Sequence, residues 1–189
     1  MKSISTFRIS VALLFFTLLL TNLTNAQPQK GKSIKASIGL GLSAPYDDVD
    51  LTGSGFYAQG EYVIGITRWF GVRPYAGVVF TSADENENLP GYKVTSDAFL
   101  FGGKARVVAP IPYVAPYIEV GLGGSIGSFE TYTPFTNIKK NGMLVHIPFS
   151  LGLAIGKKHS IELEFTYYYH PAAEQFSGAA AIGFTFPLK

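Results

Sequence analysis

Residues 142–170 read GMLVHIPFSLGLAIGKKHSIELEFTYYYH, and apolar side chains occupy every odd position over 143–155 and again over 161–169. Successive side chains of a β-strand point to opposite faces of the sheet, so a period of two predicts two strands joined by a short turn. Glu162 and Glu164 alternate with the apolar residues of the second strand. One face of this strand is therefore apolar and the other polar.

The same alternation recurs along the chain in eight segments. They are Ser33–Ser43, Gly55–Ile66, Val72–Ser82, Thr95–Val108, Val114–Ile126, Met143–Ile155, Ser160–Tyr169 and Phe176–Phe186. Segments of about ten residues with one apolar face are typical of strands that cross a membrane in a closed barrel. The sequence predicts an all-β fold: an eight-stranded antiparallel up-and-down transmembrane β-barrel, with short periplasmic turns and long extracellular loops.

The connections between the segments alternate in length. The long ones are Ala44–Ser54, Ala83–Lys93, Gly127–Asn141 and His170–Gln175, and the short ones are Thr67–Gly71, Ala109–Tyr113 and Gly156–Lys158. Short turns on the periplasmic side and long loops outside produce this alternation in outer-membrane barrels. A secreted β-sandwich, the competing all-β interpretation, gives no reason for it.

Pro148 conflicts locally with this interpretation, because it lies several residues inside the sixth segment. Proline has no N–H to donate to a strand ladder, so it is tolerated near a strand end and is awkward in the middle. We expect a bulge or a distortion of the sixth strand at this residue.

The first 26 residues have the pattern of a secretory signal peptide. Lys2 and Arg8 precede an apolar run, Ile9–Leu20, and the small residues at 24–26 suit a cleavage site. The apolar run is too short for a membrane anchor. Residues 27–189 then form one outer-membrane β-barrel domain, in which 13 basic residues balance 13 acidic ones. The chain has no cysteine, which excludes disulfides.

Charged residues within the segments fall almost entirely on the face opposite the apolar one. The inward set is Lys35, Glu61, Arg73, Lys104, Arg106, Glu119, Glu162 and Glu164. An eight-stranded barrel is just wide enough inside for side chains to fill it, and an uncompensated buried charge costs several kcal/mol. Four charges of each sign are what a filled, neutral interior requires, so we interpret this set as a lumen charge network.

Aromatic residues gather near the ends of the segments. On the short-turn side they are Trp69, Phe70, Tyr113, Phe184 and Phe186, and on the long-loop side Tyr46, Phe56, Phe80, Phe129, Tyr169 and Phe176. Two belts of this kind are typical of the interfaces of membrane proteins.

With these features the chain resembles the small outer-membrane β-barrel proteins of Gram-negative bacteria, the group that contains the barrels of outer membrane protein A and outer membrane protein X. Its last segment ends in Phe184-Thr185-Phe186, as in barrels whose terminal aromatic is recognised by the assembly machinery, although Pro187-Leu188-Lys189 follow. The resemblance implies a location in the cell outer membrane. The implied partners are outer-membrane lipids and lipopolysaccharide, the assembly machinery and an extracellular ligand at the loops, with no nucleic acid.

No pattern indicates catalysis, a metal site or a cofactor. We interpret His146 as a hydrogen-bonding residue of the lumen, since no second histidine lies near it in the pattern. In some barrels of this type a histidine and a serine two residues later form a lipid A deacylase site, but here Ala172 follows His170 at that spacing. The acidic stretches at 47–50 and 84–87 lack the ligand spacing of a calcium loop and are interpreted as solvated loop charge.

The sequence therefore favours an integral outer-membrane protein with a structural or surface-interaction role, whose lumen is plugged by paired charges. A narrow channel or carrier for small molecules is the first alternative. A lipid A-modifying outer-membrane enzyme is the less favoured one.

Overall fold

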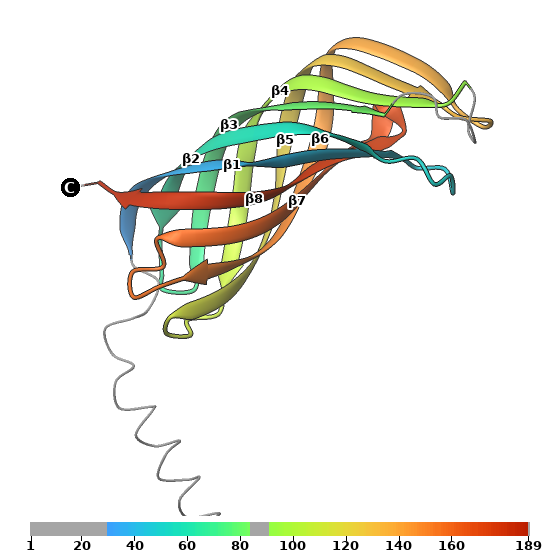
Figure 1. Ribbon diagram of the computed structural model, residues 1–189. Helices are drawn as coiled ribbons and strands as arrows, with labels where there is room; N and C mark the ends of the chain where they lie inside the picture. Colours follow the sequence, from blue (N-terminus) through green and yellow to red (C-terminus); the bar gives the residue numbers. More distant parts are fainter. Residues whose placement is uncertain (1–29, 84–90, 189) are drawn as a thin grey trace, which may run out of the picture.

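A computed structural model describes residues 30–83 and 91–188 of the chain. Eight strands form a closed barrel in chain order, in which each strand is antiparallel to its neighbours and β1 pairs with β8 (Figure 1). The strands are β1 (Gly31–Pro45), β2 (Gly53–Gly65), β3 (Phe70–Ala83), β4 (Lys93–Val108), β5 (Val114–Tyr132), β6 (Asn137–Ile155), β7 (Ile161–His170) and β8 (Gln175–Pro187). The predicted all-β barrel is confirmed.

A single 3-10 turn, η2 (Pro171–Ala173), connects β7 to β8. No helix in the described part of the chain is long and apolar enough to cross a membrane. The predicted signal peptide, residues 1–26, and the acidic stretch 84–87 lie outside the described residues.

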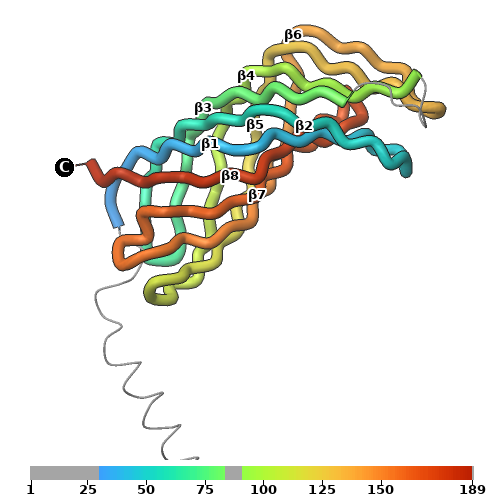
Figure 2. The backbone as a smooth tube through the Cα atoms, in the orientation of Figure 1, coloured from blue at the N-terminus to red at the C-terminus, as the bar shows by residue number. Residues whose placement is uncertain are grey.

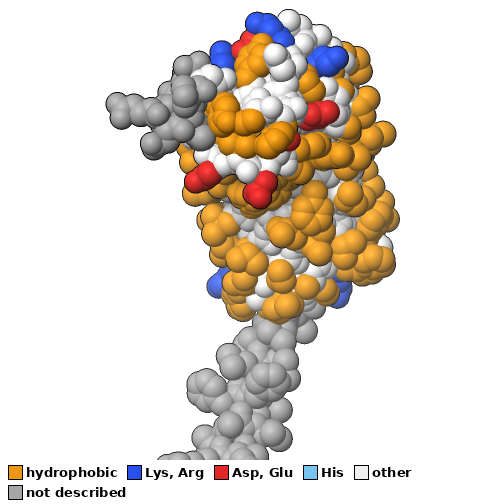
Figure 3. Space-filling model, turned by 90° about the vertical axis from the view of Figure 1, so that its right-hand side faces the viewer, with side chains coloured by type: hydrophobic (Ala, Val, Ile, Leu, Met, Phe, Trp, Pro, Cys, Tyr) orange, Lys and Arg blue, Asp and Glu red, His pale blue; other side chains and the backbone are white. Residues whose placement is uncertain are grey.

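Side chains alternate along each strand between a buried lumen and an exposed outer wall. On β6, Phe149 and Leu151 are 41% and 47% exposed, whereas Ser150 between them is fully buried. Figure 3 shows apolar side chains covering the wall, with charged side chains gathered towards its two ends. An apolar surface that surrounds the barrel in this way is stable in hydrocarbon and not in water.

The prolines inside strands interrupt the ladder without shifting its register. Between β5 and β6, pairing runs to Val120 opposite Phe149 and resumes at Gly123 opposite His146, so two pairs are missing beside Pro148. Equal numbers of residues are skipped on both strands. The distortion expected at Pro148 is therefore a local gap in pairing and not a bulge. Pro74 produces a similar gap between β2 and β3.

The long loop expected at Gly127–Asn141 is wrong in its extent. β5 continues to Tyr132 and β6 begins at Asn137, so only Thr133–Thr136 connect them. The sequence of this outer hairpin shows no alternation of apolar and polar residues, because both faces of the hairpin lie beyond the apolar band. Without that alternation the sequence does not predict the strands there.

The aromatic belts are present, with one exception. Trp69 and Phe186 are 54% and 59% exposed near the short turns, and Phe56 and Phe80 are 45% and 48% exposed near the opposite end. We expect Phe129 in the belt on the long-loop side, but its side chain is fully buried and lies against the ring of His170, with 4.7 Å between ring centroids. Phe129 is an even number of residues from Glu119 and Ser125 on β5, so its side chain points to the same side, into the lumen.

The lumen is narrow enough to require glycine at some positions. A Cβ atom added to Gly123 on β5 would overlap the Tyr75 hydroxyl and the His146 ring, whereas one added to Gly103 on β4 meets nothing within 4 Å. Overpacking a rigid interior generally costs about 1–3 kcal/mol, because neighbouring side chains are forced out of their rotamers.

We therefore predict that Gly123→Ala lowers the free energy of unfolding by about 1–3 kcal/mol, and that Gly103→Ala changes it by less than about 0.5 kcal/mol. Urea unfolding in phospholipid vesicles, followed by the fluorescence of the single tryptophan, Trp69, measures both. Equal effects of the two substitutions would contradict a tightly packed lumen at Gly123.

Candidate functional site

The structure places all eight charged residues of the proposed lumen network inside the barrel, each at most 6% exposed. They come from β1, β2, β3, β4, β5 and β7. Register brings several of them directly opposite one another: Lys35 faces Glu61, Arg73 faces Lys104, and Arg106 faces Glu119. The charges therefore form one layer that links six of the eight strands.

Arg106 and Lys104 hold one side of this layer together. Arg106 donates from its two terminal nitrogens to Glu162, at 2.8 and 2.7 Å, and from Nε to Glu119 at 2.6 Å. Lys104 Nζ lies 2.6 Å from Glu61 and 2.7 Å from Glu119. A bidentate guanidinium–carboxylate pair fixes both partners in orientation, which a single ammonium contact does not.

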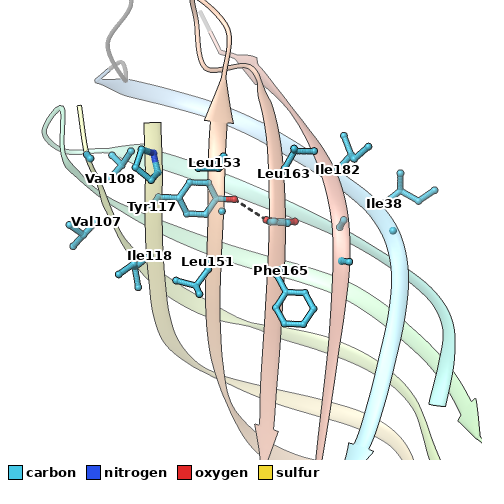
Figure 4. Close-up of a pocket in the computed structure, with 17 residues that line it drawn as sticks. Ile38, Val107, Val108, Tyr117, Ile118, Leu151, Leu153, Leu163, Phe165 and Ile182 are labelled. Carbon is cyan, nitrogen blue, oxygen red and sulfur yellow. Dashed lines mark hydrogen bonds between the residues drawn. The ribbon is translucent and has the colours of Figure 1, made fainter. Parts of the chain in front are cut away.

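Lys35 and Arg73 complete the layer. Lys35 Nζ lies 3.1 Å from Glu162 and also contacts Glu164, and Arg73 lies 3.0 Å from Glu61. The Tyr117 hydroxyl donates to the Glu164 carboxylate at 3.4 Å, whereas Ile118, the next residue on the same strand, belongs to the exposed wall. Figure 4 shows the side chains of Tyr117 and Ile118 on β5. Each of the eight charges contacts at least one charge of opposite sign.

A second polar layer lies beside the charges, towards the outer end. Gln59 donates to Glu61 at 2.8 Å and accepts a hydrogen bond from the Tyr168 hydroxyl at 2.5 Å. Tyr168 is also 3.0 Å from the Tyr57 hydroxyl. Neutral hydrogen-bonding groups thus continue the filling of the lumen above the charges.

The structure also forms a cluster that the sequence did not reveal. Ser125 Oγ on β5 lies 2.6 Å from His146 Nδ1 and 2.8 Å from His170 Nε2, and all three side chains are fully buried. The predicted role of His146 as a hydrogen-bonding residue of the lumen is confirmed, but a second histidine does lie near it, with 5.4 Å between the ring centroids of His146 and His170. The serine beside His170 comes from another strand and not from the position two residues later, where Ala172 stands. Ser125, His146 and His170 lie on three different strands, so the register between the strands brings them together. The spacing of residues along one strand does not reveal such a contact.

The hydrogen bonds of this cluster run in one direction. His170 Nδ1 donates to the carbonyl of Tyr168 at 3.1 Å, because a carbonyl can only accept. With both rings neutral, His170 Nε2 accepts from the Ser125 hydroxyl, Ser125 accepts from His146 Nδ1, and His146 Nε2 accepts from Tyr75 at 2.5 Å. The Ser125–His170 pair resembles a serine nucleophile with an oriented base, but both side chains are fully buried.

At the outer end, the hairpin of β5 and β6 extends past the strands that follow it. Figure 2 shows it, in gold and orange, curving over the end of the barrel opposite the C-terminus. Pairing between β6 and β7 begins only at Ile147, so within the described chain residues 137–146 pair with β5 on one side and with no strand on the other. Strand residues Asn137–Val145 are exposed or half-buried on both faces.

Side chains anchor this hairpin to the rim. Thr133 donates to Asp47, and Thr136 donates to Glu174 at 3.1 Å. On its outer part Glu130 pairs with Lys139 at 2.5 Å and with Lys93 at 2.9 Å. Hydrogen bonds from Lys139 and Lys93 lower the pKa of Glu130 below its usual range. The hairpin is therefore held in place at its tip by two carboxylates of other connections, and its own charged side chains are Glu130, Lys139 and Lys140.

These features define the class of protein. A closed eight-stranded barrel with an apolar wall, aromatic belts and a polar interior is an outer-membrane β-barrel, and the protein lies in the outer membrane.

Comparison with solved structures supports the fold. Neisserial surface protein A matches with a TM-score of 0.57 and 13% sequence identity, over 84% of this chain and 98% of that one. The N-terminal β-barrel domain of Pseudomonas aeruginosa OprF matches at 0.49 with 11% identity, and Ail of Yersinia pestis at 0.47 with 18% identity, each over 84% of this chain and 100% of the other. No protein-family model and no curated protein matches the sequence. At these identities the likeness concerns the fold.

The charge layer predicts a large difference between buried and exposed lysines. Lys104→Met removes the cation shared by Glu61 and Glu119 and leaves buried negative charge uncompensated, which costs about 3–5 kcal/mol. Lys139→Gln breaks an exposed pair at the hairpin and leaves the urea midpoint unchanged, because water screens that pair.

Urea unfolding in vesicles again measures both variants. Lys104→Arg keeps the charge and serves as a second test, retaining more stability than Lys104→Met. Equal midpoints for Lys104→Met and Lys139→Gln would contradict a role of the charge layer in stability.

Proposed function

We propose that this outer-membrane barrel is a surface-interaction element, in which the barrel anchors the protein and the outer hairpin of β5 and β6 binds the partner. One observation carries the proposal: on the side away from β5, β6 has no strand partner over residues 137–146, and only η2 packs beside part of this edge. Every second residue of such an edge directs its N–H and C=O groups away from the paired strand. An extended chain can hydrogen-bond to these groups and so join the sheet as a further strand.

The charge of the hairpin selects among extended partners. The hairpin itself, residues 123–146, carries Lys139 and Lys140 against the single carboxylate of Glu130, so its own net charge is positive. The strand addition would therefore suit an acidic extended segment of an extracellular protein. Lysines on an edge also discourage pairing between two copies of the same edge, since like charges would meet.

The rigidity of the hairpin favours binding. Its tip is tied to Asp47 and to Glu174, on two other connections of the barrel. A strand edge that is held in place before binding loses less conformational entropy when a partner pairs with it. A loop without such contacts would lose more.

The filled interior supports a plugged lumen over a channel. Eight buried charges neutralise one another across six strands, and the neutral layer of Gln59, Tyr57 and Tyr168 follows them. A continuous water path would have to break several of these contacts at once, and each exposes a buried ion. We infer that the barrel is closed to solutes.

A lipid-modifying enzyme finds less support. Ser125 and His170 have the separation of a nucleophile and its base, but both are fully buried and face the lumen. An acyl chain in the outer leaflet would meet the wall of the barrel and not this pair. We propose that the cluster is a packing and hydrogen-bonding element.

The surface role is tested with the double substitution Lys139→Glu, Lys140→Glu on the hairpin. A short synthetic peptide of alternating valine and glutamate serves as the probe, and a copy with prolines in place of alternate valines cannot pair as a strand. We expect the first peptide to bind the unsubstituted protein in nanodiscs and to lose about tenfold in affinity on charge reversal.

Lys32→Glu, a reversal on β1 at the opposite end of the barrel, is the matched control and leaves binding unchanged. Equal binding of the proline peptide would show attraction by charge alone. That result, or the absence of binding by either peptide, would contradict strand addition at this edge.

The plugged lumen is tested by single-channel recording in planar bilayers. The unsubstituted protein is expected to show no conductance steps, because no water path crosses the charge layer. Stable, uniform steps at neutral pH would contradict the plug and favour the channel alternative, without bearing on the outer hairpin.

A further inference from the structure

A cavity of about 120 Å³ lies at the periplasmic end of the lumen, away from the outer hairpin. The ends of every strand except β5 and the turn between β6 and β7 surround it. The residues that matter are Arg73, Arg106, Lys158, His159, Glu162 and Thr185. We call this space the periplasmic pocket.

Two polar atoms of the periplasmic pocket are buried without a hydrogen-bond partner. They are Nδ1 of His159, a residue only 6% exposed, and Oγ1 of Thr185. The Nε atom of Arg73 also has no hydrogen bond, although it lies 3.4 Å from Glu119. Buried polar groups are rarely left unsatisfied, so a polar occupant is expected here.

The charge around the pocket is positive. Arg73, Arg106 and Lys158 line it, against the single carboxylate of Glu162. The eight charges of the lumen network already balance, so Lys158 at the rim is in excess. An anion in the pocket removes this excess, whereas a cation adds to it.

The volume limits the size of the occupant. One water molecule takes about 30 Å³ in the liquid, so the pocket holds a few waters or one tetrahedral oxyanion. We propose that the periplasmic pocket binds a small oxyanion of the phosphate or sulfate class, held by the Lys158 ammonium, the Thr185 hydroxyl and the His159 ring. Lys158 supplies charge, and Thr185 donates its free hydroxyl proton.

His159 makes this binding depend on pH. It lies in the turn outside the membrane-spanning strands, where its Nε2 atom is 3.1 Å from the carbonyl of Ile111 and donates to it. Burial lowers the pKa of His159, partly opposed by that hydrogen bond and by the charge of Glu162. In the neutral ring, Nδ1 therefore presents a lone pair to the pocket, which repels an anion.

Protonation turns Nδ1 into a donor that faces the anion. A bound anion favours the charged imidazolium, so it raises the pKa of His159 and binds more tightly as the pH falls. Arg73, Arg106 and Lys158 oppose protonation of the ring, and Glu162 favours it. The anion shifts this balance towards the protonated form.

Sulfate is the best probe, because its charge is constant between pH 8 and pH 5 whereas that of phosphate changes. The mature protein in neutral detergent micelles is titrated with sulfate at constant ionic strength, and amide shifts of Ser160 and Thr185 are followed by NMR. We expect saturable shifts and an affinity that rises as the pH is lowered.

Four substitutions locate the site. Lys158→Gln and Thr185→Val each lower the sulfate affinity by about tenfold, since each removes a donor to a charged group. His159→Gln removes the pH dependence, because glutamine does not titrate. Lys157→Gln is the matched control: it removes the neighbouring exposed lysine, which does not line the pocket, and leaves the affinity unchanged.

Heat-dependent gel mobility verifies that each variant is folded. Linear, non-saturating shifts would show that the pocket holds water only and would overturn the proposal. So would equal losses in Lys157→Gln and Lys158→Gln, because these would indicate diffuse attraction by the turn. Binding that is independent of pH in the unsubstituted protein would overturn the role of His159.

Discussion

The constraint on which this structure depends is that a charge inside a closed barrel has no access to water and must find its partner across strands. The outer wall faces hydrocarbon, so polar side chains can only point inward. Inside, desolvation of an unpaired ion costs several kcal/mol, and only close opposite charges with good geometry offset it. Arg106, with a bidentate contact to Glu162 and a further bond to Glu119, meets this condition most completely.

The same constraint divides the barrel into layers along its axis. The charge layer lies towards the periplasmic turns, neutral tyrosine and glutamine side chains follow it, and the Tyr75–His146–Ser125–His170 chain fills the outer part. Within each layer most polar groups find partners on other strands. The two ends of the barrel, with the outer hairpin and the periplasmic pocket, are where we propose that partners bind.

Much of the fold was predictable because a membrane barrel is decided by local alternation. Each residue from Ile147 to Leu153 on β6 shows its face from its polarity alone, and neighbouring strands pair in chain order. The outer half of the β5–β6 hairpin escaped this reasoning, since its sequence is polar on both faces. Pro148 was correctly identified as a disturbance, but only the pairing on both sides shows that no residue is inserted.

Within the apolar band the sequence by itself determined the lumen-facing side of each strand, because the period of two and the cost of charge in hydrocarbon leave one choice of face. It also determined that the inward charges balance, since a count of signs needs no coordinates. Only the tertiary structure decided which charge meets which, that Ser125 lies between His146 and His170, and that His159 and Thr185 share a pocket. These contacts join strands far apart in the chain, and they depend on strand register and barrel closure, which alternation within one strand does not encode.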